Sequence, residues 1–314
     1  MKDKYFLISV DTEGDNQWDP SKEVSTQNVE YIPRFQELCE KYGYKPVWLS
    51  NYEMVCDDKY VDYMKPKQDK GLCEIGMHLH AWFTPPEYPL EKKTDQRDYL
   101  IEYPYEVMEQ KIITMTDLIE EKFGTKPVSH RSGRWAMDDR YFKLLKQYGY
   151  KIDCSVTPHV SWEKNLGSTG LGGTNYSEYN EKPYVTEYGL LEIPVTIRHI
   201  RYLDASRMTG FLDSLREIKR WILGRDQWLR FFETGSYLGI RKMLEKNKNE
   251  EVLLFMIHSA ELMPGGSPYF KDSNDIEALY KGIEDMFKFV QKMNYKGITM
   301  KDFYKIEMEQ KSEK

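Results

Sequence analysis

The chain has 314 residues, enough for one large domain or for two smaller ones with a sizeable core. Hydrophobic residues make up 40% of it, charged residues make up 31%, and the net charge is −6. This acidic balance, without a basic face, argues against nucleic acid as a partner. No apolar run approaches the roughly 20 residues that span a bilayer, so we expect no integral membrane segment. The first apolar run is broken by Ser9 and Asp11, and it predicts a strand rather than a signal peptide.

The four cysteines indicate free thiols. Cys39, Cys56, Cys73 and Cys154 are scattered along the chain, and no two of them have the CxxC spacing of a redox or metal site. Unpaired cysteines are usually buried, and they stay reduced inside the cell. We therefore expect buried thiols in a protein of the cytoplasm.

Short apolar runs alternate with longer amphipathic segments, which is the pattern of β–α units around a parallel sheet. The first strand, YFLISV, is almost wholly apolar, as expected of a strand buried on both faces. Further strands are predicted at 45–50, 73–80, 126–133, 151–158, 190–196 and 251–259, and a last segment at 298–306 closes the domain. Helices are predicted at 28–43, 105–124, 138–150 and 273–297. The first two end in a glycine suited to a cap, and Asp138 or Asp139 could cap the third.

About eight strands with intervening helices predict a (β/α) barrel, complete or partial, as one domain over residues 1–308. Two segments interrupt the pattern. Residues 162–188 are rich in Gly, Asn, Ser and Tyr, and a loop this long is usually functional or mobile. Residues 205–247 are interpreted as a helical insertion that could dimerise, cap a site, contact a membrane surface or pack into the core. The tail at 309–314 is expected to fray.

Polar side chains gather where the predicted strands end. Asp11 and Glu13 follow the first strand, and His78 and His80 end the third. The other such positions are His130, Arg131 and Arg134 after the fourth strand, and His258 with Glu261 after the strand at 251–259. In barrels and open parallel sheets, chemistry gathers at the carboxyl ends of the strands. Acids, histidines and arginines from four strands therefore predict an active site on this rim.

The pair His78 and His80 predicts a metal site. Residues i and i+2 of a strand point the same way, so both imidazoles could face one ion. Zn²⁺ or a related divalent ion accepts imidazole nitrogen together with carboxylate oxygen. Either Asp11 or Glu13 could supply that carboxylate, while the other acts as a base. The ion would activate a water and polarise a carbonyl, and His258 could protonate the leaving group.

Five segments resemble the motifs of one enzyme family, in the order in which that family has them. They are SVDTEGD, EIGMHLHAW, HRSGRW, LLEIPVT and FMIHSAEL. On these residues the chain resembles the polysaccharide deacetylases, the NodB-homology or carbohydrate esterase family 4 proteins, from residue 5 to about residue 304 outside the insertion. It is most similar to the bacterial branch that begins DTEGD, found among surface-polysaccharide biosynthesis proteins. The resemblance implies a distorted (β/α) barrel and metal-dependent removal of acetyl groups from N-acetylated sugars.

The resemblance also implies roles for single residues. Asp11 matches the catalytic base, and Arg131 matches the arginine that orients the base. Glu13 takes the place of a metal-binding acid, with Glu where the commoner pattern has Asp, and His78 matches the first metal-binding histidine. His258 matches the catalytic acid of the last motif.

The second metal-binding histidine of the family is replaced in this chain. Its usual position, four residues after His78, is Trp82, so His80 must take its place if two histidines bind the ion. We expect Trp82 and Trp135 to line the sugar subsites instead, because flat aromatic rings suit sugars.

Other substrate contacts are expected nearby. Arg134 is assigned to substrate binding, and the tyrosines of residues 175–188 would also line the sugar subsites. Glu261 could hydrogen-bond a histidine or bind the sugar. The expected partner is an N-acetylated saccharide.

Two other functions stay open from the sequence. A barrel of this kind could hydrolyse another C–N bond, in a formamide or a cyclic amide. The chain could also be a non-catalytic sugar-binding relative that has lost its metal, which Trp82 would favour. Asp11, Arg131 and His258 argue against that second alternative, because binding alone needs neither an acid nor a base.

Overall fold

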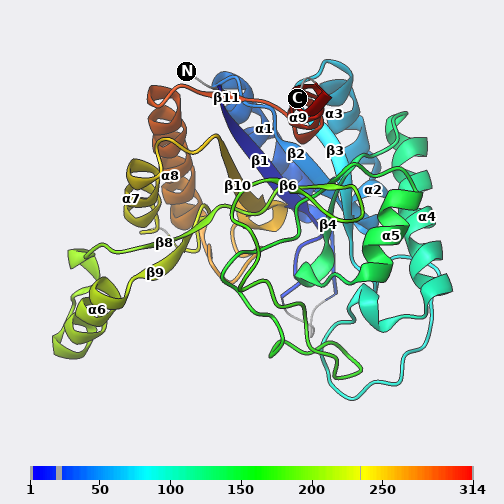
Figure 1. The fold of residues 1–314 in the computed structure, drawn as a ribbon, viewed down its shortest axis with the longest axis horizontal. Coiled ribbons are helices and arrows are strands. Elements are labelled where there is room, and N and C mark those ends of the chain that lie inside the picture. Colours follow the sequence, from blue (N-terminus) through cyan, green and yellow to red (C-terminus); the bar gives the residue numbers. More distant parts are fainter. Residues whose placement is uncertain (1–2, 19–22, 234, 313–314) are drawn as a thin grey trace.

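A curled, mainly parallel sheet organises the chain (Figure 1). The computed structural model describes residues 3–18, 23–233 and 235–312. The sheet consists of β1 (Lys4–Thr12), β2 (Val47–Ser50), β3 (Glu74–Leu79), β4 (Ser129–Ser132), β5 (Ile152–Asp153), β6 (Tyr184–Val185), β7 (Leu191–Glu192), β10 (Val252–His258) and β11 (Tyr295–Gly297). Its order is β10-β1-β2-β3-β4-β5-β7-β6, and β11 pairs with β1. Neighbouring strands are parallel except β6 and β7.

The sheet curls into a half-barrel, which confirms the predicted distorted (β/α) barrel. The chain that follows β7 lies between the two ends of the curl. There Val195 N–H donates to Val156 O at 3.0 Å, and Thr196 N–H donates to Leu254 O at 3.3 Å. One short segment therefore contacts both the chain just after β5 and strand β10.

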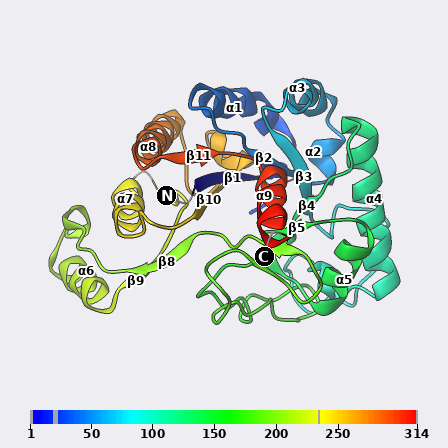
Figure 2. The same cartoon turned by 45° about the horizontal axis from the view of Figure 1, so that its top comes forward.

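Helices cover the outer face of the sheet. The helices of the described residues are α1 (Ile32–Lys41), α2 (Tyr52–Val55), α3 (Asp58–Asp69), α4 (Tyr105–Phe123), α5 (Asp139–Gln147), α6 (Phe211–Leu223), α7 (Tyr237–Lys246), α8 (Ser273–Lys292) and α9 (Met300–Ser312). Of these, α6 lies away from the sheet and α9 closes the inside of the curl. Helices α8, α1, α3, α4 and α5 form an arc around the sheet (Figure 2). Within the described ranges, we find no helix with both the length and the apolar character needed to cross a membrane.

Strand β1 shows how one strand contributes to two cores. Phe6, Ile8 and Val10 lie in the large apolar cluster beneath the outer helices, and Tyr5 and Leu7 lie in a smaller cluster inside the curl. Successive side chains of a strand point to opposite faces, so this division follows from the sequence. It also fixes which polar side chains of the strand can face the inside of the half-barrel.

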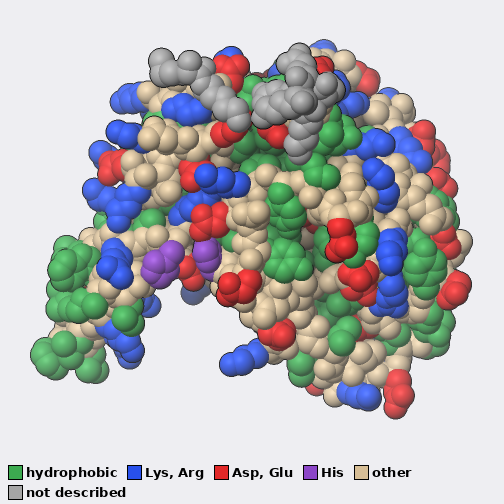
Figure 3. All heavy atoms as spheres, in the orientation of Figure 1, with side chains coloured by type: hydrophobic (Ala, Val, Ile, Leu, Met, Phe, Trp, Pro, Cys, Tyr) green, Lys and Arg blue, Asp and Glu red, His purple; other side chains and the backbone are tan. Residues whose placement is uncertain are grey.

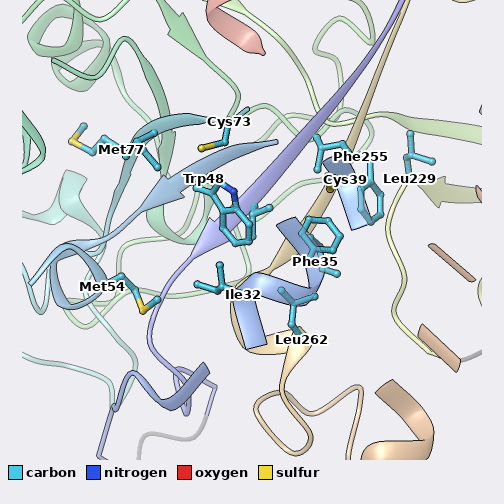
Figure 4. Close-up of a cluster of buried hydrophobic side chains, with 14 of the residues drawn as sticks. Ile32, Phe35, Cys39, Trp48, Met54, Cys73, Met77, Leu229, Phe255 and Leu262 are labelled. Carbon is cyan, nitrogen blue, oxygen red and sulfur yellow. The ribbon is translucent and has the colours of Figure 1, made fainter. Parts of the chain in front are cut away.

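Both clusters are closed by helices. Figure 4 shows part of the outer cluster, where Phe35 of α1 meets Trp48 of β2 with ring centroids 6.0 Å apart. Trp48 is fully buried, and its indole N–H donates to Gln36 at 2.8 Å. The inner cluster is closed by Met300 and Phe303 of α9, both fully buried. Complete burial of one such side chain contributes about 1.5–3 kcal/mol.

Two predicted helix caps are present in the structure. Asp138 caps α5 by accepting the Tyr141 N–H at 2.9 Å, while Asp139 is the first residue of the helix. Helix α4 ends at Gly124, whose φ of +71° suits glycine. Helix α9 extends to Ser312, and the fraying of the tail at 309–314 stays a prediction. Residues 313–314 lie outside the described residues.

Residues 205–247 differ from the predicted helical insertion, because a strand lies within them. Strands β8 (Ile197–Ile200) and β9 (Arg225–Trp228) form an antiparallel pair, and α6 connects them. This arm, residues 197–228, projects from the rest of the molecule in both ribbon views (Figures 1 and 2). Helix α7 instead packs against α8 and belongs to the body.

The four cysteines are free thiols, as predicted. Cys39, Cys73 and Cys154 are buried, but Cys56 is exposed, so the expectation of burial is wrong for this residue. Cys56 follows the short helix α2 as its cap, at a turn on the surface, where no apolar neighbour is required.

Candidate active site

Inward-facing side chains of four strands meet at the carboxyl edge of the half-barrel. Asp11 on β1 is in register with His258 on β10, and His78 on β3 is in register with Arg131 on β4. Asp11 stands four residues after the inward-facing Leu7, so strand alternation gives it the same face. All four polar residues are at most 9% exposed. The structure therefore brings together side chains that the sequence placed on four separate strands.

Glu13, His78 and His80, hereafter the metal group, could together hold an ion. His80 Nε2 lies 2.9 Å from His78 Nε2. Glu13 Oε2 lies 3.2 Å from His80 Nε2 and 3.6 Å from His78 Nε2. All three residues are buried. The sequence left open which acid would face the histidines, and in the structure it is Glu13, while Asp11 pairs with Arg131.

The spacing within the metal group fits a tetrahedral ion. Zn²⁺ binds nitrogen and oxygen ligands at about 2.0–2.2 Å, so two of its ligand atoms stand about 3.3 Å apart. The three distances within the group are 2.9, 3.2 and 3.6 Å. His78 Nδ1 also lies 3.0 Å from Arg131 O, so the neutral ring donates there and leaves Nε2 free for an ion. The donor set and its orientation therefore fit zinc.

Two members of the metal group, Glu13 and His80, are held in the forms that bind a metal. Burial raises the pKa of Glu13, but His258 and the two imidazoles outweigh burial and hold this pKa well below its ordinary value. Burial, together with the neighbouring His78, lowers the pKa of His80 to about 4. Burial lowers the pKa of the third member, His78, but Asp11 and Glu13 outweigh burial and raise this pKa above its ordinary value. An ionised carboxylate and a neutral imidazole are the forms that coordinate ions.

Asp11 forms a buried ion pair with Arg131. Burial raises the pKa of Asp11, but Arg131, His78 and His258 outweigh it and hold this pKa below its ordinary value. Arg131 Nη1 donates to Asp11 Oδ1, and Arg131 Nη2 donates to Ser9 Oγ at 2.9 Å. Arg131 thus both orients the Asp11 carboxylate and keeps it ionised.

Two charged side chains hold His258 from behind. Arg230 Nη2 lies 3.0 Å from His258 Nδ1 and 2.6 Å from Glu261 Oε1. Glu261 Oε2 accepts the His258 backbone N–H at 2.9 Å. Arginine can only donate, so His258 Nδ1 is an acceptor and the ring proton lies on Nε2. His258 Nε2 is 3.7 Å from Asp11 Oδ2. The site therefore presents a proton next to the Asp11 carboxylate.

A pocket of about 550 Å³ is lined by the metal group, Asp11 and His258. Its aromatic lining consists of Trp18, Trp82, Tyr99, Trp135, Trp162 and Tyr269. Its other polar lining consists of Gln17, Asp95, Gln96, Arg97, Ser132, Arg134, Asn165 and Arg230. Aromatic rings combined with many hydrogen-bonding groups suit a polar ligand with flat apolar faces. The loop at 162–188 contributes Trp162 and Asn165 to the lining, which agrees with the prediction that a loop of this length is functional.

Trp82 lies at the position where the resembled family has its second metal-binding histidine. Its ring stacks on His80, with centroids 4.3 Å apart and an angle of 26° between the planes. Its indole Nε1 is buried without a hydrogen-bond partner in the described part of the chain, and the ring lines the pocket. Trp82 therefore supports the His80 ring and leaves one buried donor for a ligand or water to satisfy.

Arg134 and Trp135 line the pocket on the turn that follows β4. Their φ angles are +55° and +64°, in the left-handed region that non-glycine residues rarely adopt and that recurs at functional sites. The Arg134 guanidinium lies 4.2 Å from the Tyr99 ring centre and donates to Leu166 O at 3.0 Å. The Trp135 ring centre lies 5.2 Å from the Arg131 guanidinium. This turn thus connects the loop at 162–188 with the ion pair of Asp11 and Arg131.

Two expected substrate contacts lie elsewhere in the structure. Glu261 is fully buried behind His258 and is not among the residues that line the pocket. Of its two possible roles, the structure shows the hydrogen bond to a histidine. The tyrosines of 175–188 do not line the pocket either, and Tyr176 is buried, with its hydroxyl donating to Trp135 O at 2.6 Å. Tyr176 thus supports the pocket wall from behind.

His130 shares the carboxyl edge with the site but faces away from it. It alternates with Arg131 on β4, so its ring points to the outer face of the sheet. His130 Nδ1 lies 2.7 Å from Asp153 Oδ1, and Nε2 lies 2.7 Å from Tyr141 OH. Both ring nitrogens are therefore satisfied, and Asp153, which had no role from the sequence, is the partner of a structural histidine.

Arg230 contacts His258 but was not predicted from the sequence, like several of the residues that line the pocket. It follows β9 within the segment that was predicted to be helical, so no strand-end signal marked it. The short segment after β9 returns from the arm and brings this guanidinium to His258 across 28 residues of sequence separation. The sequence marks Arg230 only as an arginine next to aromatic residues in WLRFF, and this pattern does not by itself indicate an active site.

Lys111 of α4 anchors the loop that carries Trp82. Its Nζ donates to Ala81 O at 2.9 Å, to Thr84 O at 2.5 Å and to Pro86 O at 2.7 Å. The residue is 2% exposed, and burial lowers its pKa to about 8. One ammonium group thus satisfies three carbonyls of a loop with no regular secondary structure.

We expect the substitution Lys111→Met to destabilise the protein by about 1–3 kcal/mol, because buried carbonyls lose their donor. The midpoint of urea unfolding measures this loss. Lys65→Met is the matched control, because Lys65 Nζ donates to the single carbonyl of Phe123 at 2.8 Å. Equal effects of the two substitutions would contradict the anchoring role of Lys111.

No family model and no curated protein matches the sequence, whereas solved structures match the fold. A protein described as a polysaccharide deacetylase of Mycobacterium smegmatis is similar with a TM-score of 0.53 and 12% identity. The match covers 99% of this chain and 93% of that one. The chain has the fold of the polysaccharide deacetylases. This finding agrees with the resemblance of the five sequence motifs.

Two solved structures with other titles are also similar to this chain in fold. A 4-alpha-glucanotransferase of Thermococcus litoralis has a TM-score of 0.52 and 15% identity, over 95% of this chain and 39% of that one. A GH57-type branching enzyme of Pyrococcus horikoshii has a TM-score of 0.51 and 11% identity, over 96% and 69%. At these identities the similarity shows the fold alone, so the chemistry must be argued from the residues of the site.

Proposed function

We propose that the protein is a metal-dependent hydrolase that removes an acetyl group from an N-acetylated sugar. The observation that carries this proposal is the buried metal group beside Asp11 and His258 in one pocket. A metal site, a base and an acid thereby share one cavity. We propose zinc as the ion, since two imidazoles and one carboxylate with an open position form a catalytic zinc donor set.

Each residue of the site would have one role in the hydrolysis. Once bound by the metal group, the ion would polarise the acetyl carbonyl and lower the pKa of a water. Asp11, kept ionised by Arg131, takes a proton from that water as the new C–O bond forms. His258 gives its Nε2 proton to the departing nitrogen as the C–N bond breaks. The products are acetate and the free amine of the sugar.

The pocket lining supports a saccharide as the substrate. Trp135 and Trp162 present nearly parallel rings, with centroids 6.3 Å apart and 9° between their planes. Arg97 and Asn165 add hydrogen-bonding groups at the same wall. Stacked aromatic faces bordered by polar groups bind the apolar faces and the hydroxyls of sugar rings.

Acetate release tests the proposal directly. Zinc-loaded protein is incubated with oligosaccharides of N-acetylated hexosamines and, in parallel, with their N-formylated analogues, and acetate, formate and free amine are measured. We expect acetate and amine in equal amounts. Formate without acetate would favour the alternative of a hydrolase for another C–N bond, and the absence of both products would contradict the proposal.

A sugar-binding protein without catalysis is the second candidate. The observation that favours it is the stacking of Trp82 on His80 in place of a second histidine at position 82. Such a protein would bind the same oligosaccharides but hold no metal after zinc loading. Metal content measured beside sugar binding therefore separates the two candidates.

We expect the substitution Arg230→Met to lower kcat by about 10–100-fold and to change KM little, because a hydrogen bond to a charged group contributes about 1.5–3 kcal/mol. The loss arises because His258 Nδ1 loses its donor and the ring proton is no longer fixed at Nε2. Initial rates of acetate release over a range of substrate concentrations measure the two constants separately.

Arg225→Met is the matched control for this substitution. Arg225 lies on the arm, pairs with the buried Glu217 at 2.5 Å and lies 4.3 Å from the Tyr202 ring centre, but it does not line the pocket. We expect its kcat to stay close to that of the wild type. A similar loss of kcat in both variants would show that Arg230 acts only through stability.

A further inference from the structure

Helix α6 carries a broad apolar face that is open to solvent. Six of its residues, Phe211, Leu212, Leu215, Trp221, Ile222 and Leu223, are between 49% and 79% exposed. Figure 3 shows hydrophobic side chains gathered at the outer end of the arm, separated from the rest of the molecule by a hollow. Single exposed apolar residues are ordinary, but a contiguous exposed patch marks an interaction surface.

The sequence of α6 concentrates this apolar surface on one side of the helix. Phe211, Leu215, Ile218 and Ile222 are spaced by four, three and four residues, so they share one face. The helix has 13 residues and is therefore about 20 Å long. The apolar face is thus long enough to lie flat on a surface but far too short to cross a bilayer.

The opposite side of α6 is fixed to the arm, so the direction of the apolar face is set by structure. Glu217 is 1% exposed, and it accepts from Arg225 Nη2 at 2.5 Å and from the Asp204 N–H at 2.9 Å. Arg225 belongs to β9, which pairs with β8 along its whole length. The arm therefore turns the buried side of the helix toward itself and the apolar side outward.

The exposed charges on α6 are basic. Arg216, Lys219 and Arg220 are exposed, whereas the acid Glu217 is buried and Asp213 is half-buried. Asp213 accepts from Thr209 Oγ1 at 2.7 Å and pairs with Arg216 at 3.3 Å, and Arg220 lies 3.8 Å from Glu217. The three basic residues thus outnumber the two acids, only one of which reaches solvent. An apolar face rich in Trp, Phe and Leu, flanked by Lys and Arg, is typical of helices that lie in the interface of an anionic bilayer.

We propose that the apolar face of α6 seats the protein on the surface of an anionic lipid membrane. Phe211 and Ile222 enter the boundary between headgroups and acyl chains, and Lys219 and Arg220 contact lipid phosphates. Charge complementarity favours lipid over a second copy of the chain. Two α6 faces in contact would bring the basic residues of both copies together, with Asp213 as the one acid on each helix that is not buried.

The position of the arm gives this surface a consequence for the site. In Figure 1 the arm lies at the lower left, and the loops below the sheet lie at the lower centre and right. Membrane binding would thus bring the pocket close to saccharides that are carried on lipids. This consequence rests on the proposed function, whereas membrane binding itself does not.

Co-sedimentation with vesicles tests the proposal. The full chain is mixed with vesicles of phosphatidylcholine alone or of phosphatidylcholine with phosphatidylglycerol. We expect the wild type to bind the anionic vesicles. The double variant Phe211→Ser, Ile222→Ser should bind them about tenfold more weakly, because its apolar anchors are lost. The double variant Lys219→Glu, Arg220→Glu should also bind more weakly, and added salt should weaken the wild type.

The matched control is the double variant Leu171→Ser, Val185→Ser. It removes apolar side chains of 44% and 40% exposure that lie outside the arm and outside the pocket lining. We expect this control to bind the anionic vesicles as the wild type does. All these variants leave the pocket intact, so acetate release from soluble oligosaccharides reports on the proposed function separately from membrane binding.

Three results would overturn the proposal. The first is no binding of the wild type to anionic vesicles. The second is binding that the substitutions on α6 leave unchanged. The third is a dimer in sedimentation velocity that the change Phe211→Ser, Ile222→Ser dissociates, without any vesicle binding, because the face would then be covered by a second copy.

Discussion

Replacing Asp11 by asparagine is expected to lower kcat by about 10²–10⁴-fold, the range over which a positioned base contributes. Asp11 Oδ2 faces His258 Nε2 at 3.7 Å inside the pocket, and an amide at this position cannot take a proton. Acetate release measures the loss. The metal group does not include Asp11, so the variant should still bind zinc. Near-normal turnover would remove Asp11 from the role of base.

The same substitution is expected to change stability in a pH-dependent way. The asparagine leaves the buried Arg131 charge without its partner, which costs about 3–5 kcal/mol at neutral pH. The folded-state pKa of Asp11 lies below its ordinary value, so the ion pair contributes stability above the unfolded pKa of about 3.9 and loses it as the pH falls through the folded pKa. Urea unfolding at pH 7 and below about pH 4 should therefore show a difference that shrinks in acid.

Asp204→Asn separates the chemistry from the stability. Asp204 is also a buried carboxylate paired with an arginine, with 3.1 Å between its Oδ2 and Arg207 Nε, but it lies on the arm. We expect this variant to lose stability at neutral pH and to keep its kcat. If it lost activity as Asp11→Asn does, destabilisation alone would explain both results.

Removing His80 is expected to abolish both metal binding and turnover. The His80→Ala variant leaves a carboxylate and one imidazole, and loss of a ligand should weaken zinc binding by more than about 100-fold, beyond the effect of losing an outer contact. Metal content after dialysis, measured by mass spectrometry beside the wild type, tests this. About one equivalent of zinc in the wild type and little in the variant is the expected outcome.

His199→Ala is the matched control for the metal experiment. His199 is exposed on the arm and lies 2.9 Å from Asp226, far in the sequence from the metal group. Its loss should leave the zinc content unchanged. Full zinc content in His80→Ala would show that His80 is not a ligand. A wild type without metal after loading would instead favour the sugar-binding relative.

The two substitutions in the site should therefore give different combinations of results. Asp11→Asn should keep the metal and lose turnover, while His80→Ala should lose both. This contrast follows from the separation of the two acids, since Glu13 faces the imidazoles and Asp11 faces Arg131. Loss of the metal in both variants would show that Asp11 and Glu13 hold the ion together.

Strand alternation and parallel pairing made much of the site predictable. Asp11, His78 and His258 follow short apolar runs, Arg131 lies in the short strand SHRS, and the carboxyl ends of parallel strands meet at one edge. The residues i and i+2 of a strand share a face, which paired His78 with His80. These are local rules of the backbone, so the sequence alone was enough to place the four strand ends on one rim.

Other parts of the site depend on contacts between distant segments. Arg230 reaches His258 from a segment that shows a helical pattern in the sequence, and Glu13 lies beyond the end of its strand, where alternation no longer applies. The aromatic lining comes from loops on both sides of the pocket, such as Trp18 and Trp162. No local rule of the backbone fixes where such loops fold back.

The arm shows most clearly what the sequence determined and what only the tertiary structure decided. The 4-3-4 spacing of Phe211, Leu215, Ile218 and Ile222 was enough to specify an amphipathic helix, because helical periodicity is local. Whether that face packs into the core or meets solvent depends on what lies beside it. The pairing of β8 with β9 carries α6 away from the body and leaves Phe211 79% exposed, because burial is a property of neighbouring segments and not of one helix.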